Sequence, residues 1–313
     1  MAATRHKVLI TGGSGFVGTW VLRELLRRNA EPIVYDLAAN PQRWQRIIGA
    51  DCEQIRFVPG DLVDRQALGR AMDEHEISHV IHLGALLTPA CQQDPWLGCQ
   101  VNVLGSVAVF EEIRQRSSQI KGFSFASSLA VYGSPADNDQ VSDIDDSNAP
   151  SFYGAYKRSV ELIARQYWKH FQISSFGLRP HVVYGPERNV GISAGPSLAA
   201  RAAALGEAFQ ISFQGQLGYD YVEDVALAFV RGAFETPRGA VVVDLPSQQA
   251  CPDDFIRLIT EIAPQSAGKI TVDGDSLPAN TPAKWNLINT VFPDWQFTSL
   301  QDGIQKTIEF YRA

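Results

Sequence analysis

Short apolar runs alternate with amphipathic stretches along the first 185 residues. The apolar runs predict buried strands over residues 7–11, 32–36, 55–62, 79–85, 122–128 and 173–185. Between them, apolar residues recur at helical spacing, which predicts helices over residues 19–28, 65–75, 95–116 and 155–171. This alternation is typical of βαβ units, so we expect a parallel sheet with helices on both faces.

The pattern changes after residue 185. The stretch "GPERNVGISAGPS" shows little periodicity, and shorter segments follow up to a last helix predicted over residues 299–311. We therefore expect a Rossmann-type doubly wound α/β domain over residues 1–185. Residues 186–313 are expected to form a smaller C-terminal lobe that mostly binds substrate, with segments that return to the Rossmann body.

Composition and charge narrow the class of partner. The chain is 45% apolar and 19% charged, as in ordinary globular proteins. Its net charge of −7 argues against nucleic acid or an anionic membrane as partner. No apolar run approaches the roughly 18 residues that a membrane span needs. The expected partner is therefore a small-molecule substrate.

The chain offers few signs of secretion or of metal binding. It enters its first strand without a signal-peptide region, so the cytoplasm is the expected location. Its four cysteines lack any C-x-x-C pairing, and we expect neither a disulfide framework nor a zinc site. The acidic stretch 136–150 lacks the ligand spacing of a calcium loop, which indicates a solvated surface loop. His79 and His82 project to opposite faces of one strand, so no catalytic metal is expected.

The glycines of "TGGSGFVG" follow the first predicted strand and open the first helix. Gly12 permits a tight turn, and Gly15 lets backbone N–H groups approach a pyrophosphate. Gly18 allows the helix to pack close to the sheet. Because the positive end of the helix dipole also points at this turn, the motif predicts a dinucleotide site.

An acidic residue at the end of the second strand selects the dinucleotide. Asp36 lies 18 residues after Gly18, where a carboxylate can accept both ribose hydroxyls of an adenosine. The same charge would repel a 2′-phosphate, and no arginine immediately follows, so NAD is favoured over NADP. Asp61 ends the third strand, where it either meets the adenine or caps the strand end.

A serine, a tyrosine and a lysine form the candidate catalytic set. Tyr153 and Lys157 are four residues apart and therefore share one face of a helix. A nearby ammonium favours the phenolate, and such a tyrosine can take the proton of an alcohol while hydride leaves for NAD. Ser128 closes the fifth strand and could hold the reacting oxygen. Tyr156 is a rival to Tyr153, but Val160 lies where its lysine should be.

Together with "GDL", "HLGA", "VNVLGS", "LRPHVVYGP" and "YVEDVA", these motifs make the chain resemble the extended short-chain dehydrogenase/reductases, the NAD-dependent epimerase/dehydratase family. The resemblance covers nearly the full length. It implies Tyr153 as the base, Ser128 as its partner, and a homodimer joined as a four-helix bundle through helices near residues 95–116 and 152–170. It implies that the following residues bind the cofactor: Gly12, Gly15, Phe16, Val17, Gly18, Asp36, Asp61, Leu62, Leu83, Gly84, Ala85, Asn102, Tyr153, Lys157 and Pro180.

Two departures bear on the substrate. Family members that bind nucleotide sugars commonly read "R-Y-F-N-x-Y-G" after the sixth strand, and the asparagine contacts the diphosphate. Here residues 179–185 read "RPHVVYG", with Val182 at that position. An arginine often precedes the "VEDVA"-like segment, where this chain offers Tyr219 and Asp220. A diphosphate prefers donors and positive charge, so the chain is nearer the sugar-acid, hydroxy-acid and threonine dehydrogenases.

The substrate-binding candidates are Thr88, Ser128, Arg188 and Ser193. Arg188 could pair with a carboxylate or bind sugar hydroxyls, or it could pair with Glu187 or Glu207 on the surface. Thr88 lies in the loop expected to face the substrate, although a plain loop threonine explains it equally well.

Three functions remain open at this stage. We favour an NAD-dependent dehydrogenase that acts on a small polyhydroxylated substrate such as a sugar, sugar acid or hydroxy acid. The alternative is a nucleotide-sugar (UDP- or dTDP-sugar) epimerase or dehydratase with tightly held NAD. A non-catalytic binding protein is a third possibility, but such a protein should have lost Tyr153 or Lys157, and both are present.

Overall fold

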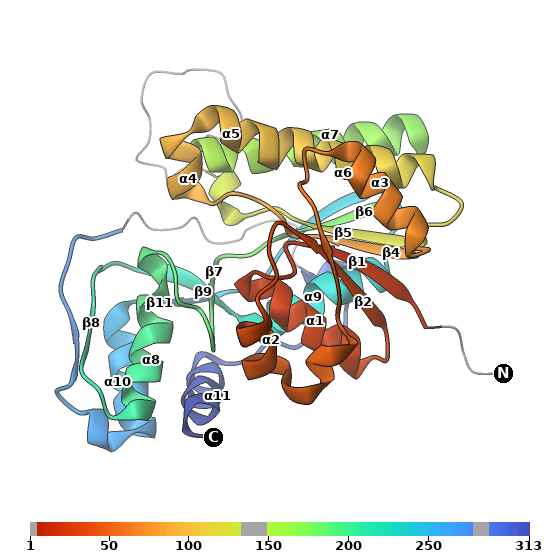
Figure 1. Ribbon diagram of the computed structural model, residues 1–313. Coiled ribbons are helices and arrows are strands. Elements are labelled where there is room, and N and C mark those ends of the chain that lie inside the picture. Colours follow the sequence, from red (N-terminus) through yellow and green to blue (C-terminus); the bar gives the residue numbers. More distant parts are fainter. Residues whose placement is uncertain (1–4, 133–148, 278–287) are drawn as a thin grey trace, which may run out of the picture. The chain divides into compact units, whose positions relative to one another are not determined.

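The computed structural model describes residues 5–132, 149–277 and 288–313 (Figure 1). The chain divides into two compact units. The first contains Met1–Arg179 and Ala226–Asp244, and the second contains Pro180–Val225 and Leu245–Ala313. A segment beyond residue 225 thus returns to the first unit, and the second unit begins at Pro180.

The first unit is built on a seven-stranded parallel sheet. Its strand order is β10-β6-β5-β4-β1-β2-β3, so the order reverses at β1, where open α/β sheets bind ligands. This arrangement confirms the predicted Rossmann-type fold. The strands are β1 (Lys7–Thr11), β2 (Glu31–Asp36), β3 (Arg56–Pro59), β4 (His79–His82), β5 (Gly122–Ala126), β6 (Ser175–Arg179) and β10 (Ala240–Asp244).

Helices cover both faces of this sheet (Figure 1). One face carries α3 (Arg65–Glu74), α5 (Pro95–Cys99), α6 (Gly105–Gln115) and α7 (Phe152–Phe171). The other face carries α1 (Phe16–Arg27), α2 (Pro41–Ile48) and the part of α9 (Val222–Phe234) that belongs to this unit. The remaining helical segments are α4 (Thr88–Gln93), η1 (Gly49–Gln54), η2 (Gln100–Leu104) and η3 (Leu129–Val131).

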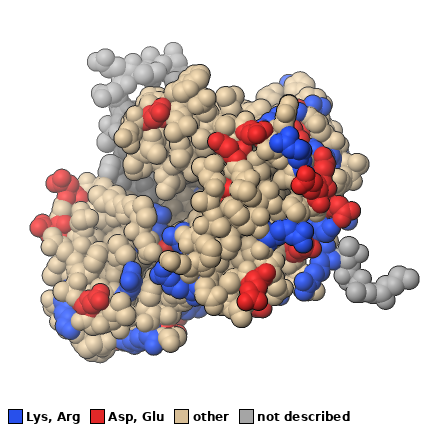
Figure 2. Space-filling model, viewed as in Figure 1, with Lys and Arg blue, Asp and Glu red and all other residues tan. Residues whose placement is uncertain are grey.

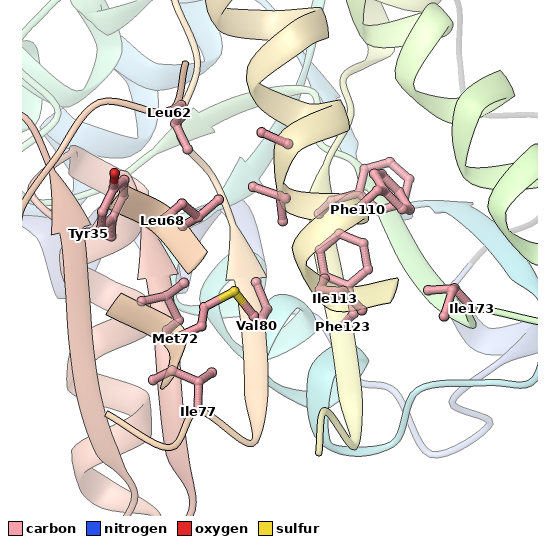
Figure 3. Packing of buried hydrophobic residues seen from close by; sticks show 14 of the residues in the cluster. Tyr35, Leu62, Leu68, Met72, Ile77, Val80, Phe110, Ile113, Phe123 and Ile173 are labelled. Atoms are coloured by element: carbon pink, nitrogen blue, oxygen red, sulfur yellow. The ribbon is translucent and has the colours of Figure 1, made fainter. Parts of the chain in front are cut away.

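The core on the α3 and α6 face is packed with large apolar side chains (Figure 3). Phe110 of α6 meets Phe123 of β5 edge to face, with ring centroids 4.9 Å apart. Met72 and Leu68 of α3 complete the layer, and both are fully buried. Burial of each such side chain stabilises the fold by about 1.5–3 kcal/mol.

The described residues of the second unit form two small sheets and three longer helices. β7 (Val182–Tyr184), β9 (Leu217–Tyr221) and β11 (Gln248–Ala250) form a sheet in the order β11-β9-β7. β8 (Phe209–Ile211) pairs with β12 (Ile270–Val272), and α8 (Gly195–Leu205) packs against α10 (Pro252–Ile262) and α11 (Leu300–Arg312). Short 3-10 turns are η4 (Ile192–Ala194), η5 (Pro264–Ser266) and η6 (Ile288–Thr290).

The strand predicted over residues 173–185 is wrong in one respect. It breaks into β6 and β7, which belong to different sheets, because Pro180 has no N–H to donate to a ladder. His181 donates its N–H to Asp220 Oδ2 across 2.7 Å instead. The predicted helix over residues 95–116 is likewise interrupted by η2, a π-helical segment.

Charges of both signs are interspersed on the face of the molecule seen in Figure 2. Over α3 and α6, Arg116 pairs with Asp73 at 2.6 Å, and Arg65 pairs with Glu112 at 2.6 Å. Most of the acidic stretch 136–150 lies outside the described residues. In the part that is described, no helix has the length and apolar character to cross a bilayer.

Candidate cofactor and catalytic site

The glycine turn leaves no room for side chains at two of its positions. Gly12 has φ +73°, and a Cβ there would lie 2.8 Å from the backbone nitrogen of Gly84. A Cβ on Gly18 would lie 2.3 Å from the carbonyl oxygen of Gly12. The turn therefore brings the ends of β1 and β4 together at the point where the strand order reverses. Bare backbone at a helix N-terminus suits a pyrophosphate, so the residues present fit NAD.

The Asp36 carboxylate is held at the end of β2 by two backbone N–H groups. Oδ2 accepts from Ser14 N across 3.1 Å, and Oδ1 accepts from Leu37 N across 2.8 Å. Each carboxylate oxygen can accept a further hydrogen bond. The structure thus orients Asp36 beside the glycine turn, as the prediction of a ribose ligand requires.

Residues after β3 and β4 form the opposite wall of the turn. Leu62 is buried and packs against Gly84, since a Cβ on Gly84 would lie 2.7 Å from Leu62 Cδ1. Leu83 donates its N–H to Thr11 O across 3.1 Å. The exposed Asp61 side chain accepts from Val63 N across 3.1 Å, which is the turn-capping role that the sequence left open.

Asn102 fixes the segment after β4. Its Oδ1 accepts from Leu86 N across 2.7 Å, and its Nδ2 donates to Leu86 O across 2.9 Å. Asn102 belongs to the π-helical segment η2, and π-bulges inside α-helices occur frequently at functional sites. Asn102 therefore sets the backbone that follows Leu83, Gly84 and Ala85.

A buried histidine of β4 links β1 to α6, a contact that the sequence did not predict. His82 Nδ1 lies 2.7 Å from Thr11 Oγ1, and His82 Nε2 lies 2.9 Å from Ser106 Oγ. Ser106 Oγ donates to Asn102 O across 2.6 Å, so it accepts from the imidazole, and Nε2 carries the proton. Burial lowers the pKa of His82 to about 3, so the chain of hydrogen bonds stays neutral.

Lys157 and Tyr153 lie together at the start of α7. Lys157 is 5% exposed, and its Nζ donates to the carbonyl oxygen of Ala126 across 2.8 Å. The same Nζ lies 5.7 Å from the centre of the Tyr153 ring. Burial lowers the Lys157 pKa from 10.5 to about 8. Tyr156, the rival, donates its hydroxyl to Pro95 O across 2.7 Å, which indicates a packing role.

Ser128 lies two residues after β5, so the strand predicted to end at Ser128 is shorter, and Ser128 caps the N-terminus of η3. Its Oγ accepts from Ala130 N across 3.1 Å, a hydrogen bond that orients the side chain and uses only an acceptor site. A hydroxyl has one proton and two lone pairs, so the hydrogen bond from Ala130 N does not use the proton of Ser128. Ser128 is therefore equipped to donate to a reacting oxygen.

Behind Ser128 lies a buried ionic cluster that sequence reasoning missed. Glu161, one turn after Lys157 on α7, accepts from Arg179 Nε and Nη2 across 2.6 and 2.7 Å. Ser127 Oγ donates to the same carboxylate across 2.5 Å. Burial alone would raise the Glu161 pKa, but these hydrogen bonds hold it below its usual value. Arg179 also approaches Asp244 at 3.4 Å, and burial raises the Asp244 pKa to about 6.

The remaining candidates are spread over both units. Thr88 is the exposed first residue of α4 in the first unit. Within the second unit, Pro180 precedes β7, and Arg188 Nη2 donates to Ser193 Oγ across 3.4 Å. Arg188 and Ser193 are thus brought together, and their roles stay predictions.

A second cluster, within the second unit, was also missed. Ser247 Oγ donates to Asp220 Oδ1 across 2.6 Å and contacts His181 Nδ1. The described residues contain no group of three or more His, Cys, Asp or Glu side chains suited to hold a metal ion. Neither cluster had a sequence signal, because each joins residues that are remote along the chain.

The family model described as "NAD dependent epimerase/dehydratase family" matches residues 8–241. The chain belongs to this family. The predicted family is therefore confirmed, and so is NAD as its cofactor. UDP-glucose 4-epimerase of Erwinia amylovora is 34% identical over 165 residues, which are 52% of this chain and 48% of that protein. D-erythronate dehydrogenase of Cupriavidus necator is 34% identical over 168 residues, which are 51% of this chain and 50% of that protein.

This member of the family spans about half the length of the curated relatives that it matches. Its fold resembles the crystal structure of Thermus thermophilus UDP-glucose 4-epimerase in complex with NAD. The TM-score is 0.77 at 24% identity, over 98% of this chain and 99% of that chain. Both an epimerase and a dehydrogenase are among the relatives, and UDP-glucose 4-epimerases are the more numerous of the two.

Proposed function

We propose that the protein is an oxidoreductase that transfers a hydride between NAD and a small polyhydroxylated substrate such as a sugar, sugar acid or hydroxy acid. The observation that carries the proposal is the position of the Lys157 ammonium, 5.7 Å from the Tyr153 ring and beside the end of β5. A positive charge at this distance favours the phenolate over the phenol.

In the proposed reaction, bound NAD supplies the hydride acceptor. Tyr153, as phenolate, takes the proton of the substrate hydroxyl while the carbon gives up its hydride, and a carbonyl results. Ser128 donates a hydrogen bond to the reacting oxygen. Lys157, held by Ala126 O, keeps its charge beside Tyr153 throughout. General-base catalysis of this kind contributes roughly 10²–10⁴-fold to the rate.

The preference for a small substrate is supported by the residues of β7 and β9. Val182 pairs with Tyr219 in the parallel register of these strands. The Val182 side chain offers no donor where nucleotide-sugar enzymes carry an asparagine, and the Asp220 carboxyl group is held by His181 N and Ser247. A diphosphate prefers donors and positive charge, and these two side chains supply neither.

A nucleotide-sugar epimerase or dehydratase with tightly held NAD is the second candidate. It is supported by the 34% identity to a UDP-glucose 4-epimerase. In that case the hydride would return to the substrate, and no NADH would accumulate.

One experiment separates the two. The purified protein is stripped of bound nucleotide, NAD is added, and NADH absorbance is followed against free sugars, sugar acids, hydroxy acids and UDP- or dTDP-sugars. NADH formed with a free acid or sugar alone supports the dehydrogenase. Conversion of a nucleotide sugar without net formation of NADH would contradict the dehydrogenase and support the epimerase or dehydratase.

We also infer that the protein acts as a homodimer in the cytoplasm. Large apolar side chains are exposed on the helices predicted to form the four-helix bundle, including Trp96 at 72%, Leu104 at 55% and Leu162 at 46%. Apolar side chains on these helices would be buried in such a bundle, which supports the proposed dimer. The four cysteines are free thiols, which is usual in a reducing compartment.

A further inference from the structure

Two opposite charges hold Ser14, the residue in the middle of the glycine turn. The Asp36 carboxylate accepts from Ser14 N across 3.1 Å, and Arg43 Nη1 donates to Ser14 O across 3.0 Å. In the sequence, no arginine immediately follows Asp36. In the folded chain, Arg43 of α2 lies at the glycine turn that Asp36 also contacts.

Arg43 is fixed in this place by the first turn of α2. Asn40 caps the helix, and its Oδ1 accepts from Arg43 N across 3.1 Å. The neighbouring Trp44 is buried, and its Nε1 donates to Gly13 O across 3.4 Å. The cap fixes the first turn of α2, and the Trp44 contact docks this helix on the glycine turn. The guanidinium therefore does not have to be ordered when a ligand arrives.

The guanidinium retains unused donors. Arginine has five N–H donors, and among the described residues Arg43 uses one, at Ser14 O. Its Nε and the Ser14 hydroxyl are both buried without a hydrogen-bond partner in the described part of the chain. The Arg43 guanidinium, which has unused donors, therefore contacts the same residue of the turn, Ser14, as the Asp36 carboxylate does.

We propose that Arg43 is a cofactor-specificity residue, which gives this NAD site a latent capacity for a 2′-phosphate that the Asp36 carboxylate suppresses. The proposal rests on the proposed role of Asp36 as the ligand of the adenosine ribose. A 2′-phosphate would replace one of the hydroxyls that Asp36 accepts, so it would meet the carboxylate first. Arginine is the residue that binds such phosphates in dinucleotide sites, through charge and directed N–H donors. Removing the charge of Asp36 alone should expose this capacity.

The test is equilibrium binding of NAD⁺ and NADP⁺ to the full chain, measured by calorimetry and independent of turnover. Asp36→Asn should weaken NAD⁺ and tighten NADP⁺ by about 10- to 100-fold, the factor that a hydrogen bond to a charged group contributes. Adding Arg43→Gln should abolish the gain for NADP⁺ and leave the NAD⁺ affinity of the single variant. Glutamine can still donate to Ser14 O, so the second change removes mainly the charge.

Arg46→Gln is the matched control, since Arg46 lies three residues further along α2 and is exposed. It should leave the NADP⁺ gain of Asp36→Asn intact. A gain that survives Arg43→Gln, or no gain in Asp36→Asn despite weaker NAD⁺, would overturn the role of Arg43. If Asp36→Asn changes neither affinity, the proposed ribose site itself is wrong.

A second measurement keeps the proposal testable if Asp36→Asn folds poorly. In the wild-type background, Arg43→Gln should weaken 2′,5′-ADP at least several-fold more than it weakens ADP, because only the former carries the 2′-phosphate. An equal loss of affinity for both ligands would mean that Arg43 only stabilises the glycine turn, and it would overturn the proposal.

Discussion

The ammonium of Lys157 donates a hydrogen bond to the carbonyl oxygen of Ala126, the last residue of β5, across 2.8 Å. This contact joins α7 to the strand that leads into Ser128. It therefore sets the spacing between the helix that carries Tyr153 and the strand end that carries Ser128. Lys157 has both an electrostatic and a geometrical part in the candidate site.

Replacing Lys157 by methionine should separate stability from activity. Burial lowers the pKa of Lys157 from 10.5 to about 8, so at pH 7 the folded protein carries a charge that the unfolded chain accommodates more easily. Lys157→Met should raise the free energy of unfolding by about 1–3 kcal/mol at pH 7, and the difference should shrink as the pH rises from 8 toward 10.5. Activity should fall at least 100-fold, by analogy with the loss of general-base assistance.

Chemical denaturation at a series of pH values and initial-rate kinetics check this prediction. Lys121→Met is the control, because Lys121 is exposed and should change stability little. A Lys157→Met protein that is less stable at pH 7 would show that the Ala126 contact outweighs the cost of the buried charge.

The two tyrosines of α7 should respond differently to loss of their hydroxyls. Tyr153→Phe should lower kcat by roughly 10²–10⁴-fold, because it removes the proton acceptor and keeps the ring. Tyr156→Phe should keep kcat and lose about 1 kcal/mol of stability with its hydrogen bond to Pro95 O. Initial-rate kinetics and NAD⁺ titration of both variants show which of the two tyrosines takes part in catalysis. Full activity of Tyr153→Phe would favour a non-catalytic binding protein.

Asp244 should make stability depend on pH in the weakly acid range. Burial raises its pKa from 3.8 to about 6, so ionisation of Asp244 costs free energy in the folded protein. Its contribution to stability is therefore complete below about pH 4 and is lost as the pH rises through 6. Asp244→Asn mimics the protonated form, so it should remove this dependence and stabilise the protein at pH 7.

Urea unfolding between pH 4 and pH 8 measures the effect. Asp275→Asn, at an exposed position, should leave the pH dependence as it is. If Asp244→Asn destabilised the protein at pH 7, the pairing of Asp244 with Arg179 at 3.4 Å would outweigh the burial of its charge.

Glu161 should be the most sensitive member of the buried cluster. Glu161→Gln leaves Arg179 buried beside a neutral amide, and breaking a buried ion pair costs about 3–5 kcal/mol. We expect a large drop in the melting temperature and a fall in kcat, since Ser127 and the start of η3 lose their anchor. Calorimetry and kinetics would test this, with Glu235→Gln as control for an ion pair of α9 whose carboxylate is half exposed. Equal decreases in melting temperature for the two variants would contradict the prediction that the buried ion pair matters more than the half-exposed one.

The proposed dimer can be tested on its apolar face. Leu162→Asp on α7, 46% exposed in the chain alone, should convert a dimer into a monomer, because a buried unpaired charge is not tolerated in an interface. Leu205→Asp on α8, 48% exposed, should leave the assembly unchanged. Sedimentation velocity at micromolar protein gives the answer. A wild-type monomer would refute the dimer outright.

Much of the fold follows from local patterns. Apolar periodicity predicted the succession of strands and helices along the chain, and the glycine spacing located the turn after β1. Both features depend on residues that are close along the chain. The same locality explains the errors. Proline at position 180 ends β6, and the π-helical segment at Asn102 interrupts a helix that periodicity alone predicts to be continuous.

By itself, the sequence determined which residues could do chemistry: the spacing of Tyr153 and Lys157, a serine near the end of a strand, and an acid that ends another. Only the tertiary structure decided which groups meet these residues. Ala126 O reaches Lys157, and Arg43 reaches the glycine turn, across 31 and 29 residues respectively. Such contacts depend on strand order and on how helices pack over the sheet, and neither is encoded in the periodicity of a single segment.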